Sequence, residues 1–335
     1  MLILKNKKLH ILIVAPFKIP ALLYGGTERV IWDLGKTLAN AGYKVSFLVK
    51  EGSYCDFANI LNFDPKKEFN DQIPDDVDLV HFNFSPHQSI KKPHIVTIHG
   101  NVPFGDVQDQ QSVFVSENHA SRYGSQIFVY NGLDWNNYPK PDLKKQRKGF
   151  HFLANAAWKV KNLKGAIAIT KKANEHLNVL GGYRFNFKMG WRFTLDSHVR
   201  FRGMVDNFKK STFLNQSNGL IFPVLWHEPF GLAVIESLYF GCPVFATPYG
   251  SLPELVTEKV GFLSNNGSEL ASAIQHSNQF NKQDCHDLAQ SSFSAQKMTE
   301  NYLLLYEKVL NGEVLNSSSP QLKENITTRY LPYTT

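Results

Sequence analysis

Residues 9–49 decide the fold class, because they hold a strand, a helix and a second strand in that order. Residues 9–15 read LHILIVA, a continuous apolar run that ends at Pro16 and is typical of a strand buried on both faces. In residues 27–41, TERVIWDLGKTLANA, the apolar side chains recur at helical spacing, and Gly42 ends the pattern. Residues 44–49, KVSFLV, form the next apolar run. A β-α-β unit of this kind predicts a parallel α/β sheet.

The same alternation continues beyond this unit, stops at a stretch rich in Pro, Lys and Asn, and then restarts. A chain of 335 residues is long enough for two such domains. We therefore expect two Rossmann-like α/β domains facing a central cleft, where folds of this kind bind ligands. The expected division is an N-terminal domain over residues 1–136, a linker over 137–149 and a C-terminal domain over 150–293. A helix over 294–310 follows, and its return to the N-terminal domain is one option. The tail over 311–335 is expected to be polar and poorly ordered.

Further elements follow from the pattern of apolar residues. In the first half we expect strands at residues 79–82, 94–98, 113–116 and 126–129; in the second half, strands at 150–154, 185–189, 220–223 and 243–246, with helices at 163–177 and 229–240.

The overall charge favours an anionic partner. Lys and Arg number 36 against 29 Asp and Glu, a formal net charge of +7, which suits nucleic acid, a membrane surface or a phosphorylated small molecule. No nucleic-acid motif is present, so nucleic acid is not expected. The three separate cysteines form no disulfide framework or zinc motif, and no HExxH indicates a metal. Without an apolar run near 18 residues or a signal peptide, we expect a cytoplasmic protein.

A glycine pair lies between the first strand and the first helix. Gly25 and Gly26 lack a Cβ, which lets the backbone approach a bulky ligand, and the helix start behind them offers unpaired N–H groups. The alternative is a plain tight turn, because the segment matches neither GxGxxG nor the P-loop motif.

Residues 227–236, HEPFGLAVIE, are a more specific candidate. Pro229 suits a helix start, where the amide of Gly231 can approach an anion. Glu228 and Glu236 are eight residues apart, about 12 Å along a helix at 1.5 Å per residue. That exceeds the roughly 5–9.5 Å of a glycosidase carboxylate pair and suits two contacts with one long ligand. The alternative is helix-start charge together with a solvent-facing Glu.

Two further candidates follow predicted strands. The basic stretch 159–165, KVKNLKG, could neutralise a diphosphate leaving group through Lys159 and Lys161, or could be an ordinary exposed loop. His99 comes directly after the predicted strand at residues 94–98, and a single His is more often structural than catalytic.

Taken together, these residues resemble the retaining glycosyltransferases of family 4, which have the GT-B fold, from about residue 9 to residue 310. The E-x7-E element between Glu228 and Glu236 is the specific part of the resemblance. The other matching elements are the glycine loop Gly25-Gly26-x-Glu28-Arg29, the turn Asn131-Gly132-Leu133-Asp134, the strand VRFRG at residues 199–203, Gly241-x-Pro243-Val244 and Gly250-x-x-x-Glu254-x-Val256.

The resemblance implies roles for the matching positions. Glu228 would contact the transferred sugar and stabilise positive charge at its anomeric carbon, with His99 beside the sugar. Glu236 would accept hydrogen bonds from the ribose hydroxyls. The backbone of Gly25 and Gly26 would meet the donor diphosphate, whose distal phosphate would face the amides of Phe230, Gly231 and Leu232.

One position departs from the family pattern, in which an Arg and, five residues later, a Lys hold the diphosphate. If that Lys is Lys161, the Arg position falls on Ala156, and Lys159 is the substitute cation. If the lysine is instead Lys164, the Arg position falls on Lys159. In either register the Arg is missing, and a Lys lacks its bidentate fork.

The resemblance implies a retaining, metal-independent hexosyltransferase that uses no cofactor. It would move a sugar from a nucleotide-diphosphate sugar, a UDP-sugar being favoured, to a hydroxyl of a carbohydrate or lipid-linked acceptor. Synthesis of cell-surface polysaccharide, lipopolysaccharide or glycoconjugates is the expected setting, with peripheral contact to an anionic inner membrane as one option. The alternatives are a nucleotide-sugar 2-epimerase or a phosphorylase of the same fold, and a non-catalytic nucleotide-sugar-binding protein.

Overall fold

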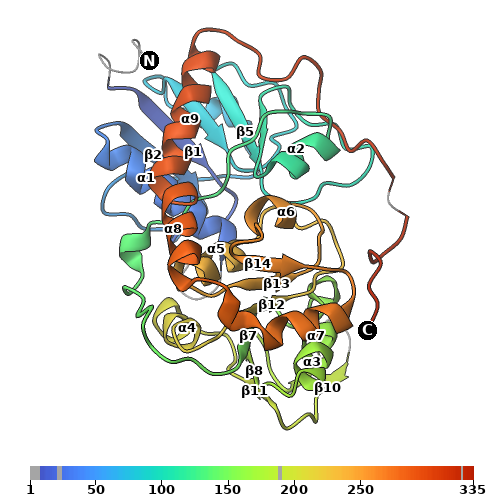
Figure 1. The fold of residues 1–335 in the computed structure, drawn as a ribbon. Coiled ribbons are helices and arrows are strands. Elements are labelled where there is room, and N and C mark those ends of the chain that lie inside the picture. The colour runs from blue at the N-terminus through green and yellow to red at the C-terminus, as the bar shows by residue number, and fades with distance from the viewer. Residues whose placement is uncertain (1–7, 21–24, 188–190, 326) are drawn as a thin grey trace. The chain divides into compact units, whose positions relative to one another are not determined.

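The computed structural model describes residues 8–20, 25–187, 191–325 and 327–335. Contacts divide the chain into two compact units (Figure 1). Unit 1 comprises Met1–Asp134 and Phe293–Asn325, and unit 2 comprises Trp135–Ser292 and Ile326–Thr335.

Unit 1 is built on a parallel sheet. In the part of the chain that the structure describes, it has six strands in the order β3-β2-β1-β4-β5-β6. The predicted β-α-β unit is confirmed as β1, α1 and β2, and strands β1, β2 and β4 to β6 are almost fully buried. The bounds are β1 His10–Val14, β2 Lys44–Val49, β3 Asn59–Asn62, β4 Leu79–Phe82, β5 His94–Ile98, β6 Ser112–Phe114, α1 Gly26–Asn40, α2 Glu117–Arg122 and α9 Ala295–Leu310.

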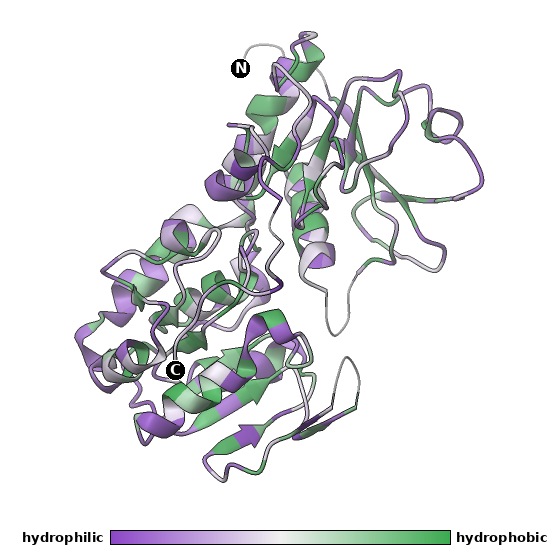
Figure 2. Ribbon diagram, turned by 90° about the vertical axis from the view of Figure 1, so that its right-hand side faces the viewer, coloured by the Kyte–Doolittle hydropathy of each residue, from purple (hydrophilic) through white to green (hydrophobic). Residues whose placement is uncertain are grey.

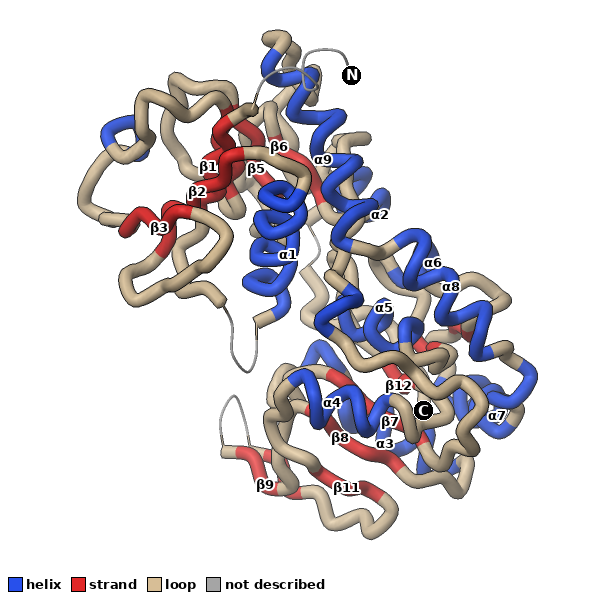
Figure 3. Tube along the Cα trace, turned by 90° about the vertical axis from the view of Figure 1, so that its left-hand side faces the viewer, coloured by secondary structure: helices blue, strands red, loops and turns tan. Residues whose placement is uncertain are grey.

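Helices α1 and α9 contact each other and pack against β2 and β5, respectively (Figure 3). The last helix of the chain thus belongs to the core of unit 1. The return is fixed at Gly132 and Leu133, whose backbone runs beside Ser294, and a Cβ at position 132 would come within 2.2 Å of the Ser294 carbonyl oxygen. Glycine at this position therefore permits the close approach.

Unit 2 repeats the architecture. Among its described residues, a six-stranded parallel sheet has the order β11-β8-β7-β12-β13-β14, and β9 and β10 form a separate antiparallel hairpin. Helices α3 and α7 pack together, α5 packs with α8, and the strands are predominantly hydrophobic (Figure 2). The bounds are β7 Phe150–Leu153, β8 Leu177–Leu180, β9 Phe185–Asn186, β10 Arg192–Phe193, β11 Val199–Phe201, β12 Leu220–Phe222, β13 Val244–Ala246, β14 Gly261–Leu263, α3 Leu163–Lys172, α4 Asn207–Leu214, α5 Leu232–Tyr239, α6 Leu252–Leu255, α7 Gly267–Gln275 and α8 Lys282–Ser292.

Three expected elements differ in the structure. The strand predicted at residues 126–129 is a single bridge between Phe114 and Phe128. The helix predicted at residues 163–177 ends at Lys172, which leaves room for strand β8. The strand predicted at residues 185–189 does not join the parallel sheet, because Phe185 pairs with Phe193 in the hairpin. Its residues 188 and 189 lie outside the described residues.

The segments expected to be a linker and a tail both make specific contacts. Arg147 is buried, and its guanidinium donates to the carbonyls of Phe240 and Gly241. In the tail, the Asn316 amide donates to the carbonyls of Gln110 and Ser112. The expectation of a poorly ordered tail therefore differs from the structure, because its polar side chains satisfy backbone carbonyls of unit 1. In the described ranges, no helix is both long enough and apolar enough to cross a bilayer.

Candidate active site

The candidate residues of unit 2 follow the carboxyl ends of its central strands. The loop after β7 leads to Lys161, the loop after β12 contains Glu228, and the loop after β13 contains Gly250. Because the strands are parallel, their carboxyl ends meet at one edge of the sheet, where open α/β folds bind ligands.

Lys161 and Glu228 form a buried ion pair at this edge. The Lys161 Nζ lies 2.6 Å from Glu228 Oε2, and the indole Nε1 of Trp226 donates to the same oxygen at 2.7 Å. The ammonium also lies over the Trp226 ring, 4.8 Å from its centroid. The exposed fractions of Lys161 and Glu228 are 8% and 7%. Buried charges are retained only when they are paired, so this arrangement fixes both side chains in one geometry.

Asn162 explains how the loop presents Lys161. It adopts a left-handed backbone (φ 53°), ends the short 3-10 turn that contains Lys159 and Lys161, and caps α3 by accepting from the Gly165 amide at 3.0 Å. Its amide also donates to the Pro223 carbonyl at 2.9 Å, which ties this loop to the end of β12. Lys159 is exposed in the same turn, so the structure separates a buried cation from a solvated one.

The backbone of Glu228 is held by the loop after β13. The Ser251 amide donates to the Glu228 carbonyl at 2.9 Å, and a Cβ at Gly250 would come within 2.2 Å of that oxygen. Gly250 also has a positive φ of 66°. Next along the chain, Gly231 is left-handed (φ 100°) and is the N-cap of α5, so the first amides of this helix follow Glu228 closely.

Glu236 lies on α5 and is 2% exposed, so the alternative of a solvent-facing Glu is wrong. Its Oε1 accepts from the buried ammonium of Lys210 on α4 and from the Tyr138 hydroxyl at 2.7 Å. Neither partner was predicted from the sequence. Lys210 lies 26 residues from Glu236 and Tyr138 lies 98 residues away, and no local pattern links them.

A guanidinium contacts Ala156, where the resemblance would place an arginine if its lysine is Lys161. Ala156 is buried, and its carbonyl accepts from Arg192 Nη1 at 2.6 Å. Arg192 Nη2 donates to the Tyr183 carbonyl at 2.8 Å, while Nε is buried without a hydrogen-bond partner among the described residues. Burial lowers the pKa of Arg192. The hairpin of β9 and β10 thus places an arginine against the loop that follows β7.

The remaining candidates lie in unit 1. Gly25 is the N-cap of α1 in an extended conformation (φ 169°), and Gly26 is the first helical residue. His99 follows β5, and its Nε2 lies 2.9 Å from Asn83 Oδ1. The Asn83 amide nitrogen donates to the Val14 carbonyl, so its oxygen faces the imidazole and Nε2 carries the proton. Burial lowers the pKa of His99 to about 4, which keeps the ring neutral at neutral pH.

Among the described residues, no group of three or more His, Cys, Asp or Glu side chains is arranged to hold a metal ion.

Part of unit 2 is similar to a known protein family. Residues 142–277 match the family model of glycosyl transferases group 1. An uncharacterized 41.2 kDa protein in the cps region of Klebsiella pneumoniae is 26% identical over 117 residues, which are 33% of this chain and 32% of that protein. Sucrose synthase 1 of rice is 25% identical over 155 residues, which are 39% of this chain and 19% of that enzyme. The matched stretches thus span a third or less of these relatives.

Solved structures are similar over most of the chain. A glycosyltransferase involved in Avilamycin A biosynthesis superposes with a TM-score of 0.75 at 18% identity, covering 91% of this chain and 98% of that one. An Anabaena protein in complex with UDP and glucose gives a TM-score of 0.64 at 16% identity. The superposition covers 89% of this chain and 99% of the Anabaena chain. At these identities the likeness shows the fold. The chain therefore has the GT-B fold, and the family match over residues 142–277 supports its being a glycosyltransferase.

Proposed function

We propose that the chain is a retaining glycosyltransferase that moves a sugar from a nucleoside diphosphate donor, a UDP-sugar in the first instance, to an acceptor hydroxyl without a metal ion. The observation that carries the proposal is the buried Lys161–Glu228 pair beside the start of α5. A cation and helix-start amides suit a diphosphate, and a carboxylate suits positive charge on a sugar carbon. The match of residues 142–277 to glycosyl transferases supports this proposal.

The reaction breaks the bond between the anomeric carbon and a phosphate oxygen and joins that carbon to the acceptor oxygen. The bonding electrons leave with the nucleoside diphosphate, and the acceptor proton is released. Lys161 and the amides of Phe230, Gly231 and Leu232 would stabilise the charge that develops on the distal phosphate. The Glu228 carboxylate would stabilise the positive charge on the anomeric carbon.

We further propose that Arg192 replaces the missing family arginine. Its guanidinium donates to the carbonyl of Ala156, which is the arginine position of the resemblance if the lysine is Lys161. An arginine offers a bidentate fork to a phosphate, which neither Lys159 nor Lys161 can do. Exposed Lys159 is then the weaker candidate for the second cation.

The remaining roles follow from the resemblance. Glu236 would accept hydrogen bonds from the ribose, and Gly25, Gly26 and His99 of unit 1 would contact the donor. A carbohydrate or lipid-linked acceptor in the synthesis of cell-surface polysaccharide, lipopolysaccharide or glycoconjugates completes the proposal, together with peripheral contact to an anionic inner membrane. The Anabaena structure that contains UDP and glucose supports the choice of a UDP-sugar.

The test begins with thermal unfolding in the presence of UDP, GDP, ADP, CMP and dTDP, with EDTA throughout. At about a hundred times its dissociation constant, the correct nucleotide adds roughly 2.7 kcal/mol to stability. Turnover of the matching sugar donors is then followed by nucleotide release and by NMR of the anomeric proton. We expect retention of configuration, and Glu228→Gln to slow turnover about 100-fold.

Lys159→Met is the matched control for Lys161→Met, because the first lysine is exposed and the second is buried against Glu228. We expect Lys161→Met to weaken nucleoside diphosphate binding at least tenfold and Lys159→Met to change it less than threefold. Binding without turnover would instead favour a non-catalytic binding protein. Conversion of the donor sugar without an acceptor would indicate an epimerase, and an inverted product would refute retention.

A further inference from the structure

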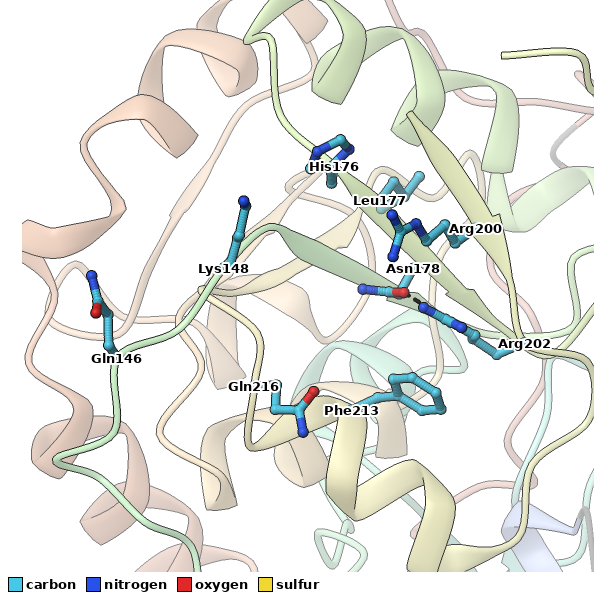
Figure 4. Close-up of a pocket in the computed structure, with 9 residues that line it drawn as sticks. All are labelled: Gln146, Lys148, His176, Leu177, Asn178, Arg200, Arg202, Phe213 and Gln216. Carbon is cyan, nitrogen blue, oxygen red and sulfur yellow. Dashed lines mark hydrogen bonds between the residues drawn. The ribbon is translucent and has the colours of Figure 1, made fainter. Parts of the chain in front are cut away.

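A basic pocket lies in unit 2, at the edge of the sheet opposite to the edge that holds Lys161. It has a volume of about 360 Å³ and lies at the amino ends of β7 and β8, beside β11 and the end of α4 (Figure 4). Its lining residues are Gln146, Lys148, His176, Leu177, Asn178, Arg200, Arg202, Phe213 and Gln216. Nothing in the proposed transfer reaction uses these side chains.

The charges of this basic pocket are uncompensated. The described residues that line it include Lys148, Arg200 and Arg202 but no Asp or Glu. Within the described ranges, none of these three cations forms a salt bridge. Arg200 lies on the edge strand β11 and Arg202 directly follows this strand, and both side chains line the pocket. Like charges on neighbouring positions repel, and a bound anion would relieve that repulsion.

One of the cations is held in a fixed orientation. Arg202 Nε donates to Asn178 Oδ1 at 3.0 Å, and its guanidinium lies over the Phe213 ring, 4.7 Å from the centroid. Figure 4 shows Arg200 and Arg202 on the two sides of Asn178. A guanidinium that is stacked and hydrogen-bonded loses little freedom when it binds a ligand, which favours a specific contact over a diffuse one.

We propose that this pocket binds a phosphate-bearing small molecule at a site separate from the proposed donor site. Arginine forks match phosphate oxygens, and Lys148 adds a third positive charge. The volume lies at the lower end of the roughly 300–1,000 Å³ of small-molecule sites, which suits a sugar phosphate or a nucleotide. The amides of Gln146, Asn178 and Gln216 can bond to the hydroxyl groups of such a ligand.

The experiment is calorimetric titration of the whole chain with pyrophosphate and glucose 1-phosphate at low salt. It is performed on the wild type and on Lys161→Met, which removes the buried lysine of the proposed donor site. We expect binding to the basic pocket to survive in Lys161→Met and to weaken at least tenfold in both Arg200→Ala and Arg202→Ala. Arg329→Ala removes one exposed positive charge elsewhere in unit 2 and should change affinity less than twofold.

Three results would overturn the proposal. One is that neither anion binds, and another is that Arg329→Ala weakens binding as much as Arg200→Ala does, which would mean a diffuse charge effect. The third is binding to phosphatidylglycerol vesicles, lost in Arg202→Ala, without binding to either free anion, since the phosphate would then belong to a lipid surface. Thermal unfolding of each variant shows that it is folded, and turnover of the sugar donor tests the transferase proposal independently.

Discussion

At the residue scale, the buried pair of Lys210 and Glu236 affects both the stability of unit 2 and the proposed ribose contact. The exposed fractions of these residues are 5% and 2%. An ion pair that is removed from water contributes little net stability, but loss of one partner leaves an uncompensated buried charge. The Glu236 carboxylate is therefore held in place by Lys210 and Tyr138 before any ligand arrives.

Lys210→Met should destabilise unit 2 by about 3–5 kcal/mol, because it leaves the charge of Glu236 buried without its cation. Lys171→Met is the matched control. It removes the lysine of a pair with Asp196 in which the Lys171 side chain is 70% exposed, and such pairs are worth about 0–1 kcal/mol. Tryptophan fluorescence in a denaturant series measures the stability of both variants. The signal comes mainly from unit 2, because Trp32 is the single Trp of the sequence that falls in unit 1. If Lys210→Met loses as little stability as Lys171→Met does, then Lys210 does not compensate a buried charge on Glu236.

The sequence could reveal both members of the Lys161–Glu228 pair as candidates, but only Glu236 of the Lys210–Glu236 pair. The spacing of Glu228 and Glu236, and the basic stretch with Lys161, are local signals that can be read without a structure. Which of these residues pair is set by the tertiary fold. Lys210 is one of two adjacent lysines on a short helix without a clear apolar face, and Arg192 lies in the second strand of a hairpin, beyond the strand expected at residues 185–189.

At the scale of elements, the loop that contains Glu228 depends on the loop after β13. The backbone at Gly250 abuts the Glu228 backbone and has a positive φ, so any side chain there forces the two loops apart. Three-residue strands such as β12 and β13 leave little regular structure to hold these loops, so the contact between them supplies the rigidity.

Gly250→Ala should lower donor turnover about 100-fold, because the added Cβ displaces Glu228 from Lys161. Gly312→Ala is the control, since Gly312 also has a positive φ, of 83°, but a Cβ there would meet nothing within 4 Å. We expect the control to lose about 1 kcal/mol of stability and to keep its turnover. Steady-state kinetics measure the turnover of both variants. An equal loss of turnover in the two would show that backbone strain alone is responsible.

The elements were predictable where hydrophobic runs are long and buried on both faces. Strand β1 and helix α1 fall where the pattern places them. Strand β3 reads NILN and is a half-exposed edge strand. Because its two ends are polar, it lacks the apolar run by which a buried strand is predicted. The bridge at Phe128 and the hairpin at Phe185 carry apolar residues at strand-like spacing, but pairing partners that lie elsewhere in the chain decide their structure.

At the scale of the whole molecule, each unit carries a buried neutral histidine on a central strand. In unit 1, the His81 nitrogens bond to Tyr306 of α9 and Thr97 of β5, both at 2.7 Å. In unit 2, His151 on β7 bonds to the hydroxyls of Ser217 and Ser237, both at 2.8 Å. Each ring thus links its strand to neighbouring elements, and each bond pattern suits the neutral imidazole.

Acid should therefore destabilise both units well above the pH at which carboxylates titrate. Burial lowers the pKa of His81 and His151 to about 3, below the unfolded value of about 6.5. Between these values the unfolded chain binds the proton and the folded chain does not, so stability falls as pH drops below about 6.5. At pH 5 the loss is about 2 kcal/mol for each ring. Asp33 acts in the opposite sense within unit 1, since burial raises its pKa to about 6.

His151→Gln tests this linkage, because glutamine keeps hydrogen-bonding capacity but does not titrate. The free energy of unfolding is measured by tryptophan fluorescence in denaturant series at pH 7.5, 6.0 and 5.0. It should fall with pH for the wild type and fall less for this variant, with a difference of about 2 kcal/mol at pH 5. The control His276→Gln replaces an exposed ring and should follow the wild-type curve. If the His151→Gln curve runs parallel to that of the wild type, then His151 is charged in the folded protein, and the neutral bridge between Ser217 and Ser237 does not exist.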